Sequence, residues 1–299
     1  MSFEANETFA PQEHRMIVVT AATGQLGRLV VEGLLARVPA TEIAVAVRSP
    51  EKAADWAARG VDVRVADYSR PETLAAAFHE GDKVLLISGS EVGRRVPQHL
   101  AVVAAAKAAG VALLAYTGVL GGDEAGFRLA DEHKATEAAI RDSGLPFVLL
   151  RNGWYTDNYT ADLAGTVERG GPVGSSGEGR IASAARQDYA DAAVAVLTGE
   201  GHEGRVYELA GDTAWSVEEF AAELAEQTGR PVAFRNVTAD EHLQVLLGAG
   251  LPAAFAEILV DVDAAILRGE LARSGGDLAR LIGRPTTPLA ETVKAALDR

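Results

Sequence analysis

The sequence predicts an α/β protein of the Rossmann type, with a doubly wound parallel sheet and a smaller, mostly helical C-terminal lobe. Short runs rich in β-branched residues alternate with helical patterns from Met16 to Arg151. These runs are apolar on both faces, as in a parallel sheet that helices cover on both sides. Crossovers of this length wind such a sheet in both directions from its centre.

Six strands and five intervening helices are expected in this region. The predicted strands are 16–20, 43–47, 61–66, 83–88, 111–117 and 146–151. The predicted helices are 25–37, 51–59, 71–78, 96–109 and 130–142. The first helix shows the apolar spacing of one buried face, formed by Leu26, Leu29, Val30, Leu34 and Leu35. Pro71 suits the first turn of the third helix.

The pattern weakens after residue 155. Residues 156–186 are rich in Gly and Ser and are predicted to form loops around a site. Asp188 is expected to cap a helix over 189–197, and 206–209 to form a strand that rejoins the sheet. The expected organisation is a disordered extension at 1–15, a Rossmann domain at 16–155 to which 187–215 returns, and a substrate-side lobe at 156–186 and 216–299.

Composition excludes several classes of function. Asp and Glu outnumber Lys and Arg by 42 to 28, so the net charge of −14 disfavours nucleic acid and anionic membranes as partners. There is no Cys, which excludes disulfides, thiolate nucleophiles and Cys-based zinc sites. The six His are scattered, so no metal is expected. The N-terminus lacks a signal-peptide pattern and no apolar run is long enough to span a membrane, so the expected location is the cytoplasm.

The turn after the first strand is predicted to bind a pyrophosphate. Its sequence, TAATGQLG (20–27), opens the first helix, whose free amides and dipole favour an anion. The predicted contacts are Ala21, Ala22, Thr23, Gly24, Gln25, Leu26 and Gly27. Ala21 replaces the first Gly of the usual pattern, and since Ala tolerates positive φ poorly, the turn is expected at negative φ. The alternative is an ordinary βα turn.

The second strand favours NADP(H) over NAD(H). Its end carries Arg48 instead of the carboxylate that bonds an NAD ribose, and a guanidinium suits a 2′-phosphate. The alternative is a solvated Arg. Asp67 and Tyr68 end the third strand beside the expected adenine, although Asp67 equally suits a turn. Ser88, Ser90, Glu91 and Thr117, at the ends of the next two strands, are expected to line the cofactor.

The usual proton relay of short-chain reductases is absent. None of the six Tyr is followed by Lys four residues on. An acceptor that needs orientation more than a dedicated acid is therefore favoured.

Several longer motifs resemble one family. The segments VRSPEK, LLISGSEVGRRVPQH, LADEH (129–133) and LLRNGWYTDNY (149–159) are similar to those of NmrA-like atypical short-chain reductases. The resemblance covers nearly everything from Met16 onward and implies an NADPH-dependent quinone reductase. It also implies that residues 90–92, including Val92, hold the middle of the cofactor. The nicotinamide side would be formed by Gly153, Trp154, Tyr155 and Asn158.

Three residues are candidates for catalysis. Asn152 and Tyr155 follow the sixth strand at the edge where ligands bind in doubly wound sheets. His133 lies on the helix after the fifth strand and could donate a proton or hydrogen-bond an oxyanion; a structural role is the alternative. Trp154 could stack on a quinone or simply pack in the core.

The main hypothesis is a direct hydride transfer from NADPH to a small-molecule quinone, without flavin or metal, by a monomer or homodimer. A second hypothesis is reduction of another conjugated acceptor, such as a triphenylmethane dye. A third is a redox-sensing regulator that binds NADP(H) without turnover.

Overall fold

A seven-stranded parallel sheet organises the computed structural model, which describes residues 15–298. Its order is β3-β2-β1-β4-β5-β6-β9. The strands are β1 (Ile17–Thr20), β2 (Ile43–Val47), β3 (Asp62–Val65), β4 (Lys83–Leu86), β5 (Leu113–Val119), β6 (Phe147–Asn152) and β9 (Val206–Leu209). The predicted fold class and the late strand that rejoins the sheet are confirmed, since β9 pairs parallel to β6. Apart from Arg15, the expected extension at 1–15 lies outside the described residues.

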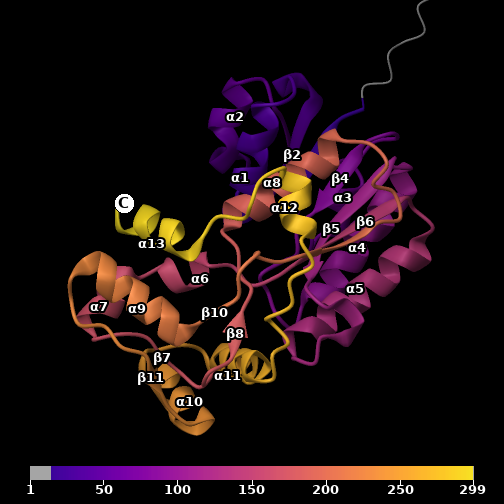
Figure 1. The fold of residues 1–299 in the computed structure, drawn as a ribbon. Helices are drawn as coiled ribbons and strands as arrows, with labels where there is room; N and C mark the ends of the chain where they lie inside the picture. The colour runs from indigo at the N-terminus through magenta and orange to yellow at the C-terminus, as the bar shows by residue number, and fades with distance from the viewer. Residues whose placement is uncertain (1–14, 299) are drawn as a thin grey trace, which may run out of the picture.

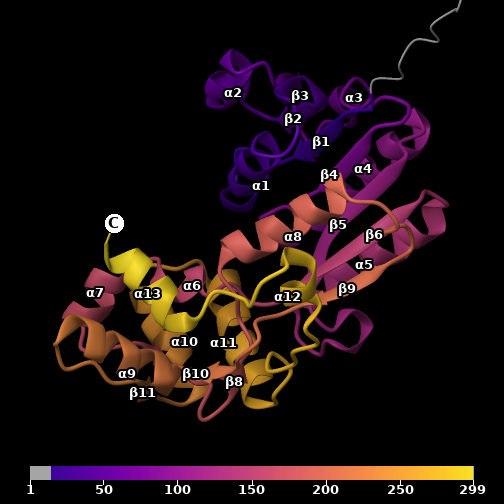
Figure 2. The same cartoon turned by 45° about the horizontal axis from the view of Figure 1, so that its top comes forward.

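Helices cover both faces of this sheet (Figures 1 and 2). One face packs against α1 (Gln25–Leu35), α2 (Ala54–Ala58) and α8 (Arg186–Thr198). The other packs against α3 (Pro71–Leu74), α4 (Arg95–Ala109) and α5 (Leu129–Ser143). Short 3-10 turns occupy Ala40–Glu42, Pro50–Ala53 and Gly122–Glu124. The third helix ends at Leu74, four residues before its predicted end.

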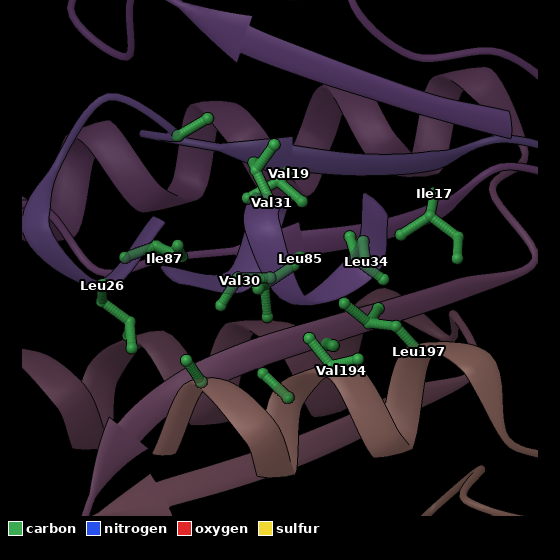
Figure 3. Packing of buried hydrophobic residues seen from close by; sticks show 14 of the residues in the cluster. Ile17, Val19, Leu26, Val30, Val31, Leu34, Leu85, Ile87, Val194 and Leu197 are labelled. Atoms are coloured by element: carbon green, nitrogen blue, oxygen red, sulfur yellow. The ribbon is translucent and has the colours of Figure 1, made fainter. Parts of the chain in front are cut away.

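The most extensive packing between two helices joins α1 to α8. Val30 and Leu34 of α1 share one buried cluster with Val194 and Leu197 of α8 (Figure 3). Gly33 permits the approach, because a Cβ there would lie 2.9 Å from Val194 Cγ2. Each fully buried Val or Leu contributes roughly 1.5–3 kcal/mol, so this face fixes the first helix firmly on the sheet.

The start of α8 differs from the prediction. The helix begins at Arg186 with Ala185 at the N-cap, so Asp188 lies inside the first turn and is no cap. Its buried carboxylate accepts hydrogen bonds from the backbone and hydroxyl of Thr287 (2.7 and 2.9 Å) and pairs with Arg284. A carboxylate within the first turn of a helix is favoured by the dipole. Asp188 thus lies near the start of the helix, as predicted, but its carboxylate connects α8 to residues 284–287 instead of capping the helix.

A second lobe has its own buried cluster, which includes Leu163, Trp215, Phe220, Val262 and Val293. Its elements are α6 (Asp157–Thr160), α7 (Leu163–Glu168), β7 (Val173–Gly174), β8 (Arg180–Ile181), β10 (Trp215–Ser216), α9 (Val217–Thr228), β11 (Arg235–Asn236), α10 (Ala239–Gly248), α11 (Ala253–Leu267) and α13 (Leu289–Leu297). Residues 156–186, predicted as loops, therefore contain two short helices and two short strands.

One helix of the C-terminal segment leaves this lobe. α12 (Asp277–Ile282) packs against α8 and β9, and Leu278 is buried in the cluster of the sheet. The chain then returns to the second lobe, where α13 packs against α6, α7 and α9. Within residues 15–298, no helix has the length and apolar character needed to cross a membrane.

Candidate cofactor-binding and active site

A cavity of about 520 Å³ opens where the strand order reverses, between β1 and β4. The chain leaves β1 toward one face of the sheet and leaves β4 toward the other face. A crevice therefore forms between the carboxyl ends of these two strands. It is lined by Ala21, Thr23, Gly24, Gln25, Leu26, Gly27, Ala46, Val47, Arg48, Lys52, Ala66, Asp67, Tyr68, Ile87, Ser88, Gly89, Ser90, Glu91, Arg95, Gln98, Thr117, Tyr155 and Arg186. Most of the predicted cofactor contacts thus come together in one place.

The turn after β1 is tighter than expected. Ala21 has a φ of 47°, so the expected negative φ is wrong. The turn closes through a hydrogen bond from Gly24 N to the Ala21 carbonyl oxygen (2.9 Å), with Ala21 in the left-handed region. A Cβ on Gly27 would lie 2.6 Å from that same oxygen and 2.7 Å from Ala22 Cα. The glycine therefore lets the start of α1 pack against the turn, and this start lines the cavity.

Hydroxyl groups join the strand ends that form the cavity floor. Thr20 Oγ1 donates to the Leu85 carbonyl oxygen (2.9 Å) and accepts from Ile87 N (3.1 Å). The Tyr68 hydroxyl contacts Thr20 Oγ1 and donates to the Ile87 carbonyl oxygen (3.0 Å). Ser88 N donates to Thr117 Oγ1 (2.9 Å). These bonds fix the ends of β1, β4 and β5 relative to one another.

Basic groups gather at the β2 side. Arg48 and Lys52 both line the cavity, and Arg48 Nη1 lies 3.4 Å from Glu91 Oε1. The exposed Arg48–Glu91 pair contributes at most about 1 kcal/mol, so Arg48 is readily released to another anion. Asp67 lines the same end and also accepts from Ser69 N (2.9 Å), so it lies in a turn as the alternative foresaw.

Tyr155 and Arg186 form the opposite end of the cavity. The Arg186 guanidinium lies 4.8 Å from the centre of the Tyr155 ring and pairs with Asp157 (3.1 Å). Asn152 Nδ2 donates to the Tyr155 hydroxyl (3.1 Å), while the buried Asn152 Oδ1 has no hydrogen-bond partner. Burial raises the pKa of Tyr155, so this end carries neutral hydrogen-bonding groups beside one cation.

Other predicted residues lie away from the lining. They are Ala22, Val92, His133, Asn152, Gly153, Trp154 and Asn158. Ala22 is fully buried behind the turn, whereas Val92 is exposed. Trp154 packs against the cluster of the second lobe, which matches the core-packing alternative.

His133 is buried behind β5. Its Nδ1 lies 2.7 Å from the Tyr116 hydroxyl, and burial lowers the pKa of His133 to about 3. The ring is therefore neutral at physiological pH, and proton donation from an imidazolium near neutral pH is not available at this position.

Sequence reasoning missed four polar residues of the cavity wall, Lys52, Arg95, Gln98 and Arg186. Lys52 lies in the motif VRSPEK, four residues after Arg48, so its position in the sequence could have indicated a second phosphate-binding cation. Arg95 and Gln98 lie in the first turn of α4, and Arg186 begins α8. Whether the side chains of a first turn face the cavity depends on how the helix packs on the sheet.

The cavity fits an anionic dinucleotide. Four cationic side chains line it against two carboxylates, although the protein as a whole carries a charge of −14. The amides at the start of α1 suit a pyrophosphate, and the adjacent pair of Arg48 and Lys52 suits a further phosphate. Among residues 15–298, no group of three or more His, Asp and Glu side chains could hold a metal ion.

A doubly wound sheet with such a cavity at its switch point defines a dinucleotide-binding protein. The sequence matches the family model described as NAD(P)H-binding over residues 21–200. It is 49% identical over 278 residues to quinone oxidoreductase 2 of Escherichia coli (strain K12), covering 93% of this chain and 97% of that protein. The chain belongs to the NAD(P)H-binding, NmrA-like family, and the expected family and cofactor class are confirmed.

Two solved structures are closely similar. The NADPH-dependent quinone oxidoreductase of Escherichia coli complexed with NADPH has a TM-score of 0.92 and 48% identity, covering 94% of this chain and 100% of that one. The Citrobacter sp. triphenylmethane reductase complexed with NADP(H) has a TM-score of 0.90 and 43% identity, covering 94% and 99%.

The left-handed Ala21 yields a stability prediction. Ala21→Gly should raise the free energy of unfolding by about 1 kcal/mol, because an L side chain is disfavoured in this region. Ala22→Gly, at a position without positive φ, should lower it. Urea unfolding of both variants measures the two effects, and a loss of stability in Ala21→Gly would contradict the assigned backbone conformation.

Buried His133 yields a pH prediction. Because its pKa falls from 6.5 to about 3 on folding, the unfolded chain binds a proton between these values that the folded chain does not. Stability therefore falls as the pH falls from 6.5. From about pH 7 to about pH 5, the wild type should lose about 2 kcal/mol more than His133→Gln. Urea unfolding at both pH values tests this; equal losses would show that His133 is not held neutral.

Proposed function

We propose that this protein is an NADPH-dependent reductase that transfers a hydride directly to a quinone, without flavin or metal. The observation that carries the proposal is the contrast between the two ends of the cavity. The β2 end is basic, with Arg48 and Lys52, whereas the other end holds the neutral Tyr155 hydroxyl, which Asn152 bonds from behind the lining, and Arg186, which is paired with Asp157. A quinone suits such a site, because it needs orientation and hydrogen-bond donors more than a strong acid.

The comparisons support the same function. The relative from Escherichia coli is named a quinone oxidoreductase, and it shares 49% of its residues with this chain along nearly the whole of both. The similar solved structure from Escherichia coli is that of an NADPH-dependent quinone oxidoreductase.

The lining residues suit the cofactor part by part. The amides of residues 21–27 would hold the pyrophosphate, Arg48 and Lys52 the 2′-phosphate, and Asp67 and Tyr68 the adenosine. Ser88, Ser90, Glu91 and Thr117 would line the middle. When bound, the reduced nicotinamide supplies two electrons and one hydrogen as a hydride.

Tyr155 and Asn152 are assigned the nicotinamide and acceptor end. Asn152 lies behind the lining and donates to the Tyr155 hydroxyl, so its part is to orient that hydroxyl. Tyr155 offers its hydroxyl and an aromatic face. We assign His133 a supporting role behind Tyr116, because their hydrogen bond lies behind the cavity wall. The expected cytoplasmic location and the monomeric or homodimeric state stay predictions.

A second candidate is the reduction of a triphenylmethane dye. The similarity to the Citrobacter sp. triphenylmethane reductase favours it. A redox sensor without turnover remains the third hypothesis, and the same assay separates all three.

An absorbance assay tests the proposed function. Purified protein is mixed with NADPH or NADH and with a simple quinone, a triphenylmethane dye or no acceptor. We expect rapid NADPH oxidation with the quinone, because it takes a hydride without a dedicated acid. Binding of NADPH with no oxidation by any acceptor would instead support the sensor.

Arg48 is predicted to set the cofactor preference. Arg48→Ala should weaken NADPH binding roughly 10- to 100-fold, since charge-assisted hydrogen bonds to the 2′-phosphate contribute about 1.5–3 kcal/mol. NADH binding should change little. Titration followed by nicotinamide fluorescence measures both, with the exposed Arg37→Ala as the control for loss of a charge. An unchanged preference would remove Arg48 from the site.

A further inference from the structure

Arg95 is a buried cation in the cavity wall. It is the first residue of α4, only 9% of its surface is exposed, and it lines the cavity. Its Nε donates to the Gly89 carbonyl oxygen (2.5 Å), but the buried Nη1 has no hydrogen-bond partner. A buried donor without a partner costs about 1–3 kcal/mol, more when it is charged, so this group needs an explanation.

The position of Arg95 makes its charge costlier still. A cation at the N-terminus of a helix opposes the dipole, and burial lowers the pKa of Arg95. Glu132 is the carboxylate that favours the charge, yet its oxygens accept from the backbone amides of Gly93 and Arg95. The guanidinium is thus left with only part of the compensation that a buried charge requires.

Three rings near Arg95, those of His99, Tyr116 and His133, are neutral. Gly89 N donates to His99 Nε2 (2.9 Å), and burial lowers the pKa of His99 to about 4. The Tyr116 hydroxyl bonds to neutral His133, and burial raises the pKa of Tyr116. The charge of Arg95 acts on all three of these rings. Arg95 therefore produces a positive potential beside the end of β5 that these rings do not cancel and that Glu132, bonded to the backbone amides, offsets only in part.

The phosphates of the cofactor have other positively polarised sites. The start of α1 follows β1, and Arg48 and Lys52 follow β2, whereas Arg95 lies beside the ends of β4 and β5. What remains for Arg95 is an oxygen of the molecule that accepts the hydride.

We propose that Arg95 binds an oxygen of the acceptor and stabilises the negative charge that this oxygen gains on reduction. The inference rests on the proposed function and narrows its substrate class to conjugated carbonyl compounds. The hydride reduces the quinone to the hydroquinone monoanion as NADPH is oxidised to NADP⁺, and a proton from water completes the hydroquinone. A cationic triphenylmethane dye becomes neutral on accepting the hydride and places no negative charge on an oxygen.

Arg95→Gln tests this role, because Gln keeps a donor but removes the charge. We expect kcat/KM for 1,4-benzoquinone to fall roughly 100- to 1000-fold, as for loss of an oxyanion donor, while kcat/KM for a cationic dye changes less than about twofold. The Kd for NADPH should not change. Arg95→Lys should restore part of the quinone activity, and Arg37→Gln is the matched control for charge.

A binding measurement makes the test independent of turnover. The anion of 2-hydroxy-1,4-naphthoquinone mimics the charged product, and its titration into the NADP⁺ complex should show binding roughly 10-fold or more weaker in Arg95→Gln. This arm also decides the role of Arg95 if the variant reduces acceptors poorly or if the wild type does not accept the dye.

Three results would overturn the proposal. They are equal losses with quinone and dye, weaker NADPH binding as the main effect, or unchanged binding of the naphthoquinone anion. A wild type that oxidises no NADPH with any acceptor would instead remove the proposed function, and unchanged anion binding would then remove the role of Arg95 separately.

Discussion

The reversal of strand order between β1 and β4 is the constraint on which the site depends. Because α1 covers one face of the sheet and α4 the other, neither helix covers the edge between the two strands. The crevice that results would widen or close if the strand ends moved. Thr20 prevents this, since its hydroxyl bonds to β4 on one side and contacts Tyr68 on the other. Backbone topology creates the cavity, and a few buried hydroxyls fix its shape.

The charged side chains are distributed unevenly along the cavity, so its two ends differ. The surface of this acidic protein repels anions at a distance, yet Arg48 and Lys52 attract them at one end of the crevice. Near β5, burial keeps His99 and His133 uncharged. This distribution of charge favours one orientation of a dinucleotide with three phosphates, the one proposed above, with its nicotinamide toward Tyr155. Two cations line this part of the cavity: Arg186 is paired with Asp157, and Arg95 is buried with its Nη1 unpartnered.

The fold was largely predictable because strand and helix patterns are local. All six early strands lie within about two residues of their predicted bounds. The φ of Ala21 was mispredicted because the general preference of Ala for negative φ does not show the path that this tight turn takes. Asp188 suits a cap by type, but tertiary contacts with Thr287 decide its role. Arg95 and Arg186 were missed because only packing shows which way the first turn of a helix faces.

The path of α12 limits how this architecture can be divided. The chain leaves the sheet after β6, returns for α8 and β9, leaves again, returns for α12, and ends in the second lobe with α13. The second lobe is therefore built from three separate stretches of sequence, and the segments between them belong to the sheet. It cannot be exchanged between relatives as a single cassette by one recombination event. Diversity in what the lobe recognises must instead accumulate by substitution within a shared scaffold.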